Sequence, residues 1–173
     1  MDIRIQRINL EDVAVFEYLA KWSNDPEIRP FATPRFSEAE YRDIFAVEIM
    51  ASLMDHPSKN AYVVLDGEKP IGELSIDMNF DQRIYKENQT AWISLLIGDK
   101  EYRGKGISKM MMQFIDLECR NLGAKAIELG VFEYNKKAQS LYLNSGYEII
   151  GEIKSFVYNF GKWHSDIRML KKL

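Results

Sequence analysis

A short basic segment with two glycines, placed between an apolar run and an amphipathic one, constrains this chain most. The segment is Arg103-Gly104-Lys105-Gly106-Ile107-Ser108-Lys109. The apolar run 91–97 before it predicts a buried, central strand, and apolar residues recur after it at helical spacing. Two glycines let the backbone turn tightly and aim several N–H groups at one point, which the positive end of the helix dipole also faces. This order of strand, glycine loop and helix predicts a phosphate site.

Two other phosphate-binding motifs do not fit this loop. A nucleoside-triphosphate loop needs four residues between its glycines and a lysine followed by Ser or Thr, but five residues separate Gly98 from Gly104 and Lys105 precedes Gly106. A dinucleotide fingerprint needs a third glycine where Lys109 stands. On the loop alone, a simple glycine turn with solvated basic residues remains the alternative.

The hydrophobic periodicity elsewhere predicts a mixed α/β (α+β) fold with one central sheet flanked by helices. Asn9 is expected to cap the first helix, and Ser37 with Glu40 to form a capping box before the second. The predicted strands are 3–6, 61–65, 70–76, 91–97, 126–131, 147–156 and 166–170, and the predicted helices are about 10–22, 38–55, 106–122 and 136–144.

Composition narrows the class of protein further. The chain has 173 residues, which suits one domain spanning 1–173. A net charge of −3 offers no overall positive field for nucleic acid, and no apolar run approaches the ~20 residues needed to cross a membrane. The start Met1-Asp2-Ile3-Arg4 is unlike a signal peptide, and the single Cys119 cannot form an internal disulfide. We therefore expect a cytoplasmic protein.

A second segment, Leu129 to Tyr147, makes the pattern specific. Together with the loop it resembles the GNAT superfamily of N-acetyltransferases, whose loop reads Arg or Gln, any two, Gly, any one, Gly or Ala. Arg103 to Gly106 fits this loop pattern, and Ser108 stands at the last position. The later positions of the resemblance are Leu129, Val131, Asn135, Ala138, Leu141, Tyr142, Gly146 and Tyr147. The segments 22–26 and 161–166 also look like the branch with ribosomal-protein and polyamine acetyltransferases.

The resemblance implies a GNAT-like, mostly antiparallel sheet and acetyl-CoA as co-substrate. The cofactor diphosphate would lie on residues 103–109, and Asn135 would hydrogen-bond the cofactor arm. The thioester would lie along Leu95, Leu96 and Ile97, whose backbone could pair with the amide-rich arm as an extra strand. Their side chains are expected to be core.

Acetyl transfer to an amine sets two opposite requirements on protons. The amine must lose its proton, and the departing thiolate must gain one. By resemblance Tyr142 is the candidate acid; without it, a core aromatic would be the simpler interpretation. For the base we name Glu73, while Asp77, Glu128 and Glu133 or a water chain stay open, because no glutamate stands where relatives often carry one.

The remaining expectations concern other chemistries and partners. Cys119 should be buried, which disfavours an acyl-cysteine route, and His56 and His164 should lie on the surface with no metal site.

The acidic residues Asp77, Asp81 and Glu87 suggest a cationic amine as acceptor, either a small molecule or a protein N-terminus. Homodimerisation is possible. Two alternatives stay open: a regulatory module that binds CoA without turnover, and nucleic-acid binding through the basic loop.

Overall fold

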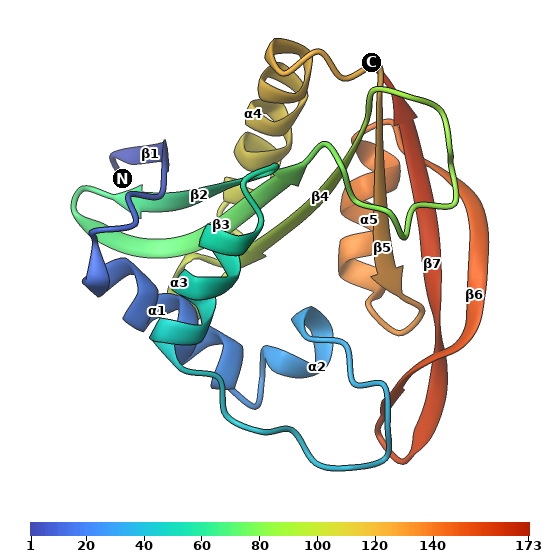
Figure 1. Ribbon diagram of the computed structural model, residues 1–173, viewed down its shortest axis with the longest axis horizontal. Coiled ribbons are helices and arrows are strands. Elements are labelled where there is room, and N and C mark those ends of the chain that lie inside the picture. The colour runs from blue at the N-terminus through green and yellow to red at the C-terminus, as the bar shows by residue number, and fades with distance from the viewer.

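The computed structural model describes all residues, 1–173, as one sheet with helices on both faces (Figure 1). The strands are β1 (Ile3–Arg7), β2 (Lys59–Asp66), β3 (Lys69–Asp77), β4 (Thr90–Ile97), β5 (Ala126–Phe132), β6 (Glu148–Asn159) and β7 (Lys162–Lys172). The helices are α1 (Val13–Asn24), α2 (Arg29–Ala32), α3 (Ala46–Asp55), α4 (Ile107–Asn121) and α5 (Lys136–Asn144), with a 3₁₀ turn at Lys100–Tyr102. No helix is both long and apolar enough to cross a membrane.

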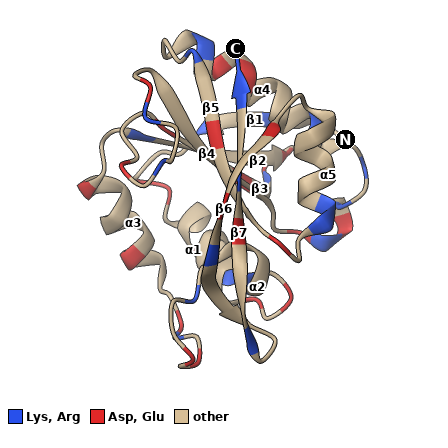
Figure 2. Ribbon diagram, turned by 90° about the vertical axis from the view of Figure 1, so that its right-hand side faces the viewer, with Lys and Arg blue, Asp and Glu red and all other residues tan.

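The strand order is β1-β2-β3-β4-β5-β7-β6, and every neighbouring pair is antiparallel except β4 and β5. The predicted mixed, mostly antiparallel sheet is therefore confirmed, with β4 at its centre. Figure 2 views the end of the sheet where β6 and β7 lie in front.

The pairing between β4 and β5 is short. Only Thr90, Ala91 and Trp92 have partners on β5, namely Ala126, Ile127 and Glu128. Beyond that point the two strands diverge (Figure 1). The sheet is thus forked at its centre, and the β5 side of β4 from 93 to 97 has no strand partner.

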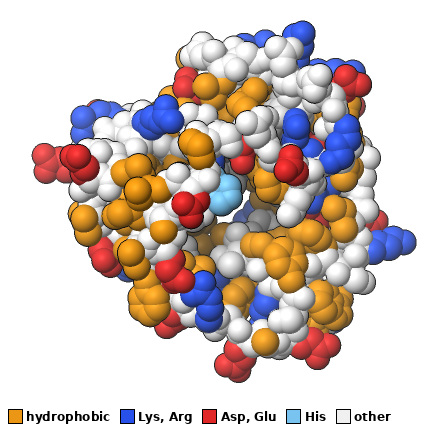
Figure 3. Space-filling model, viewed as in Figure 1, with side chains coloured by type: hydrophobic (Ala, Val, Ile, Leu, Met, Phe, Trp, Pro, Cys, Tyr) orange, Lys and Arg blue, Asp and Glu red, His pale blue; other side chains and the backbone are white.

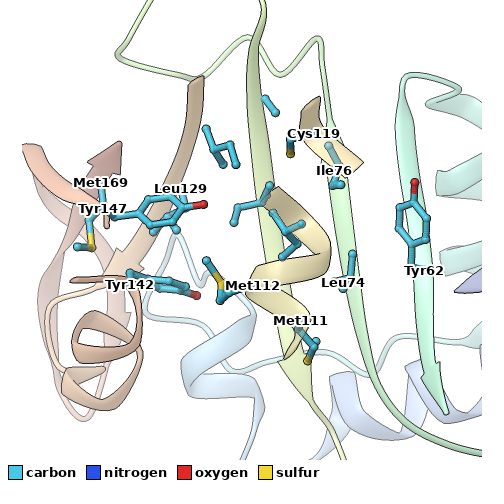
Figure 4. Packing of buried hydrophobic residues seen from close by; sticks show 14 of the residues in the cluster. Tyr62, Leu74, Ile76, Met111, Met112, Cys119, Leu129, Tyr142, Tyr147 and Met169 are labelled. Carbon is cyan, nitrogen blue, oxygen red and sulfur yellow. The ribbon is translucent and has the colours of Figure 1, made fainter. Parts of the chain in front are cut away.

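Two hydrophobic clusters lie on opposite faces of the sheet. The larger one packs α4 and α5 against the central strands through side chains such as Met111, Met112, Leu129 and Tyr142 (Figure 4). The smaller one packs α1 and α3 over β2 and contains Phe16, Leu19, Trp22 and Val63. The amphipathic helices thus bury their apolar faces as their periodicity predicts.

The first helix begins later than the sequence predicts. Asp12, not Asn9, is its N-cap, because Asp12 Oδ1 accepts a hydrogen bond from Val15 N at 3.3 Å. Asn9 Oδ1 instead accepts from Glu11 N at 3.1 Å and forms a turn before the helix. The helix also continues to Asn24.

The predicted capping box at Ser37 and Glu40 is wrong. Residues 37–45 are not helical, and α3 begins only at Ala46, with Glu48 Oε2 accepting from Phe45 N at 2.9 Å. Long-range contacts replace the expected turn. Asn24 Oδ1 accepts from Ile44 N at 2.9 Å, which ties this segment to the end of α1. The short α2 was not predicted.

We expect the two candidate caps of α1 to differ in their effect on stability. Asp12→Ala removes a side-chain acceptor from the first turn and should lower the free energy of unfolding by about 1 kcal/mol. Asn9→Ala should cost less, about 0.5 kcal/mol, since it removes only a local turn contact. Urea unfolding of both variants measures the difference, and an equal or larger loss for Asn9→Ala would contradict the structural assignment.

Candidate functional site

The loop after β4 presents a row of free backbone donors. No N–H group from Gly104 to Ser108 donates to a backbone or side-chain acceptor of the protein. Gly104 and Gly106 adopt left-handed φ angles of 77° and 81°, and Gly106 is the N-cap of α4. Free N–H groups in this geometry, at the positive end of a helix dipole, suit a phosphate or diphosphate.

The basic side chains of this loop have different surroundings. The Arg103 guanidinium turns back toward β4, where Nε donates to Ile97 O at 3.3 Å and Nη2 to Gly98 O at 3.4 Å. Lys105 Nζ lies 5.2 Å from the centre of the Tyr102 ring, and Lys109 is exposed. Arg103 therefore braces the loop, whereas both lysines remain available to an anion.

Ile107 and Ser108, which were also predicted to bind the cofactor, differ in burial. Ile107 is a core residue that packs with α4 under the sheet, so only its backbone N–H can face a ligand. Ser108 is half-buried, and its hydroxyl has no hydrogen-bond partner in the protein. The backbone, rather than the side chains, forms the anion site.

A cavity of about 580 Å³ occupies the fork between β4 and β5. Figure 3 shows the molecule hollowed near the centre of this face. The lining includes Tyr142 and Ala138 of α5 on one face of the sheet, and Phe31, Phe36 and Phe80 on the other. The cavity therefore connects the two faces of the sheet through the fork, so that one molecule could approach from each side.

Two of the three predicted β4 residues line this cavity. Leu95 and Leu96 are lining residues, while Ile97 lies beyond the cavity toward the loop. All three side chains are half-buried rather than fully core: Leu95 and Ile97 pack against the larger cluster and Leu96 against the smaller one. β4 thus links the free N–H groups of the loop to the cavity.

Tyr142 lies at the α5 side of the cavity. Its side chain is 8% exposed, and burial raises the pKa of its hydroxyl to about 12. The hydroxyl has no partner in the protein, yet only Asp116 Oδ1 and Tyr147 Oη are fully enclosed without one, so Tyr142 Oη retains open space. A protonated hydroxyl facing the cavity can donate a proton there.

Asn135 joins the cavity to the start of α5. Its Oδ1 caps the helix by accepting from Ala138 N at 3.3 Å, and the residue also lines the cavity. The Nδ2 group has no protein acceptor. Asn135 can therefore cap α5 and still donate to a ligand in the fork.

A buried charged network forms one wall of the cavity. Arg168 Nε donates to Asp166 Oδ2 at 2.7 Å, and Arg168 Nη1 lies 3.3 Å from Glu128 Oε1. The three residues are only 2%, 3% and 0% exposed, in the order Arg168, Asp166 and Glu128. Asp166 and Arg168 line the cavity. The sequence interpretation did not propose this pair, although two charges at alternate positions of an apolar strand were a signal.

Comparison with known proteins decides the family. The model of the acetyltransferase (GNAT) family matches residues 16–147, which is most of the chain. The chain belongs to the GNAT family. The free donors of its loop and its forked sheet thus lie in a GNAT domain.

Two Bacillus relatives match the chain over short segments only. YdgE of Bacillus subtilis, named as an uncharacterized N-acetyltransferase, is 41% identical over 46 residues, which are 27% of this chain and 29% of YdgE. A Bacillus subtilis subsp. natto protein named "Probable spermine N(1)-acetyltransferase" is 34% identical over 68 residues, 39% of this chain and 45% of that protein. The matched segments thus span less than half the length of either relative.

Solved structures agree in fold. The spermidine N-acetyltransferase of Vibrio cholerae in complex with CoA and spermine has a TM-score of 0.75 to this chain, with 19% identity, 99% of this chain covered and 95% of that one. At this identity the similarity concerns the fold.

The four carboxylates named as candidate bases of this GNAT domain have different surroundings in the structure. Glu73, our named candidate, lies on β3 outside the cavity lining, and burial raises the pKa of its carboxyl. Glu133 holds the His164 ring, whose hydrogen bond keeps the Glu133 pKa low. Glu128 is enclosed by its donors. Of the four, only Asp77 lines the cavity.

The two histidines differ from each other. His56 is exposed as predicted and lines the cavity at the end of α3. His164, predicted to lie on the surface, is 6% exposed, because its ring sits between Glu133 Oε1 at 2.8 Å and Asn159 O at 3.0 Å. Its position in β7 turns it inward. No group of three His, Cys, Asp or Glu side chains is arranged to hold a metal.

Cys119 is fully buried in the larger cluster, as predicted, and burial raises the pKa of its thiol to about 12. We therefore expect iodoacetamide at pH 8 to label the native protein at least ~10²-fold more slowly than the denatured protein, since the thiolate is the reactive form. Mass spectrometry over time measures both rates. Fast labelling of the native chain would contradict this burial and reopen an acyl-cysteine route.

Proposed function

We propose that this GNAT domain, spanning 1–173, transfers an acetyl group from acetyl-CoA directly to a primary amine. One observation carries the proposal: a cavity that crosses the forked sheet has the Tyr142 hydroxyl at one side and a strand leading to free N–H groups at its end. Such an arrangement brings two reactants together from opposite faces.

Acetyl-CoA would be held by the backbone along most of its length. The N–H groups from Gly104 to Ser108 would bind its diphosphate, with Lys105 and Lys109 adding positive charge. The amide-rich arm would then pair with the free side of β4 at 93–97, as an added strand does. Asn135 Nδ2 would donate to the same arm, since it has no acceptor in the protein and the residue lines the cavity. This course brings the thioester to the cavity between Leu95 and Tyr142.

Tyr142 would protonate the leaving group. Attack of the amine nitrogen on the thioester carbon forms a tetrahedral intermediate, and its collapse breaks the C–S bond and releases a thiolate. A hydroxyl with a pKa of about 12 stays protonated near neutral pH and can give its proton to that thiolate. The proton lost from the attacking nitrogen then restores Tyr142. No covalent enzyme intermediate is needed.

The acceptor in this proposal is a small amine or a protein N-terminus. Support for an amine comes from the relative named for spermine and from the structure determined with CoA and spermine. Of the acidic residues used to predict a cationic acceptor, Asp77 lines the cavity, whereas Asp81 and Glu87 do not. Lys59 also lines it, so the cavity carries both signs of charge.

A module that binds CoA without turnover is the alternative. The Tyr142 hydroxyl argues against it, because it has no partner in the protein, is not fully enclosed, and belongs to a residue that lines the cavity, where it can donate to a reactant. Release of free thiol from acetyl-CoA in the presence of an amine separates the two functions.

We predict that Tyr142→Phe lowers kcat by about 10²-fold or more, because it removes the acid. The affinity for CoA should change little, since the diphosphate and the arm are held elsewhere. A thiol-release assay over a panel of amines, with calorimetry for CoA, measures both quantities. An unchanged kcat would reject the acid role, and absence of CoA binding to the native protein would reject the cofactor site.

Tyr147→Phe is the matched control. Tyr147 is also buried near α5, but its hydroxyl is enclosed and it does not line the cavity. Its removal should leave kcat within about threefold of native, because it touches no reactant. A loss equal to that of Tyr142→Phe would point to disturbed packing rather than to a lost acid.

A further inference from the structure

Asp166 has one carboxylate oxygen committed to the protein and one that is free. Oδ2 accepts the hydrogen bond from Arg168 Nε, whereas Oδ1 has no partner in the protein. Only two side-chain oxygens of the protein are fully enclosed without a hydrogen-bond partner, Asp116 Oδ1 and Tyr147 Oη. Asp166 Oδ1 is not one of them, so it is not fully enclosed. Because Asp166 is 3% exposed and lines the cavity, its free oxygen opens into that cavity. A buried carboxylate with an unfilled position calls for a donor from a ligand.

The site for this carboxylate is built by its neighbours. A Cβ atom at Gly130 would lie 2.6 Å from Asp166 Oδ2 and 2.9 Å from Oδ1, so only glycine leaves room there. Gly130 lies on β5 two residues beyond Glu128, where the pairing with β4 stops. Asp166 therefore lies at the fork, on the wall formed by β5 and β7.

The surroundings fix Asp166 and leave a negative excess. Arg168 Nη1 donates to Gln82 O at 2.9 Å, and the guanidinium carbon lies 4.9 Å from the centre of the Trp92 ring. Glu128 accepts from Ile84 N and Tyr85 N, both at 2.9 Å. Two carboxylates thus share one guanidinium. An ammonium group at the free oxygen would complete the balance of charge in a region of low dielectric.

We propose that Asp166 is the general base of this enzyme, binding the acceptor ammonium through Oδ1 and taking one of its protons. The inference rests on the proposed acetyl transfer and supplies the catalytic group that Glu73 cannot supply from outside the cavity. Asp77 also lines the cavity, and its Oδ2 is likewise without a protein partner, because Oδ1 accepts from both Ser58 Oγ at 3.1 Å and Asn79 N at 2.9 Å. Asp77 is only half-buried at the end of β3, however, whereas Asp166 is 3% exposed and is held by Arg168 at the fork.

The protons balance over the reaction. The ammonium gives one proton to Asp166 and becomes a neutral amine, whose lone pair attacks the thioester carbon. The nitrogen then loses a second proton, which balances the one that Tyr142 gives to the thiolate sulfur. The products are the amide and the free thiol of CoA, and Asp166 releases its proton to solvent when the acetylated product leaves.

Asp166→Asn tests the assignment, since the amide oxygen can still accept from Arg168 Nε. With the best cationic acceptor of the panel, we expect kcat/KM at pH 7 to fall by about 10²-fold, with CoA affinity unchanged by calorimetry. The pH profile should change as well. Native kcat/KM should level off above the ionisation of Asp166, whereas the variant should keep rising about tenfold per pH unit, because only free neutral amine then reacts.

A pair of similar amines separates a base from a structural residue. Ethylamine is a cation at pH 7, and 2,2,2-trifluoroethylamine is mostly neutral. The loss on Asp166→Asn should be large for the cation and within about threefold for the neutral amine. Equal losses for both would overturn the proposal, because a distorted cavity would affect them alike.

Two further variants complete the test. Gly130→Ala should lower kcat/KM for the cationic acceptor by at least ~10-fold, since its Cβ displaces the carboxylate. Asp81→Asn, an exposed carboxylate outside the cavity, should stay native. Native activity and pH profile in Asp166→Asn would overturn the base role alone. No turnover of any amine by the native protein would overturn the acetyl-transfer proposal itself.

Discussion

The divergence of β4 from β5 after Trp92 and Glu128 is the constraint on which the rest of the structure depends. A parallel pair that stops early leaves backbone groups of β4 without strand partners, and buried groups of that kind need another source of hydrogen bonds. The same divergence opens the cavity between the two faces. The Trp92 side chain occupies the corner of the fork, stacked on Phe80 at 4.5 Å between ring centres and lying close to Gly130.

The buried charges of Arg168, Asp166 and Glu128 form one wall of the fork, and removing these charges from water costs free energy. Replacing a buried ion pair by apolar groups is often neutral or stabilising, whereas removing one partner is strongly destabilising. The desolvation of Glu128 is offset by hydrogen bonds from two backbone N–H groups of the loop between β3 and β4 and by the ion pair with Arg168. The network therefore fixes three things at once: the loop between β3 and β4, the middle of β5, and the position of Asp166 beside the cavity.

A second polar network holds the opposite rim, where α2 meets the β6–β7 hairpin. The Tyr134 hydroxyl donates to Pro30 O, and Asn159 Nδ2 donates to Tyr134 Oη at 2.9 Å. Asn159 Oδ1 accepts from the Tyr41 hydroxyl at 2.9 Å. The His164 ring lies between two oxygen acceptors, Glu133 Oε1 at 2.8 Å and Asn159 O at 3.0 Å, which joins β7 to the same network. Segments far apart in the sequence thus form one rim of the cavity.

The sequence by itself determined what depends on local periodicity and on glycine: the order of strands and long helices, the donor loop at Gly104 and Gly106, and α5 with Tyr142 facing inward. Those features follow from spacing and backbone freedom, which neighbours in the chain already set. Only the tertiary structure decided that residues 37–45 would not be helical, that His164 would be buried, and that Asp166 rather than Glu73 would reach the cavity. Each of these depends on a strand or segment distant in sequence, and local propensity contains no information about which distant partner a side chain will meet.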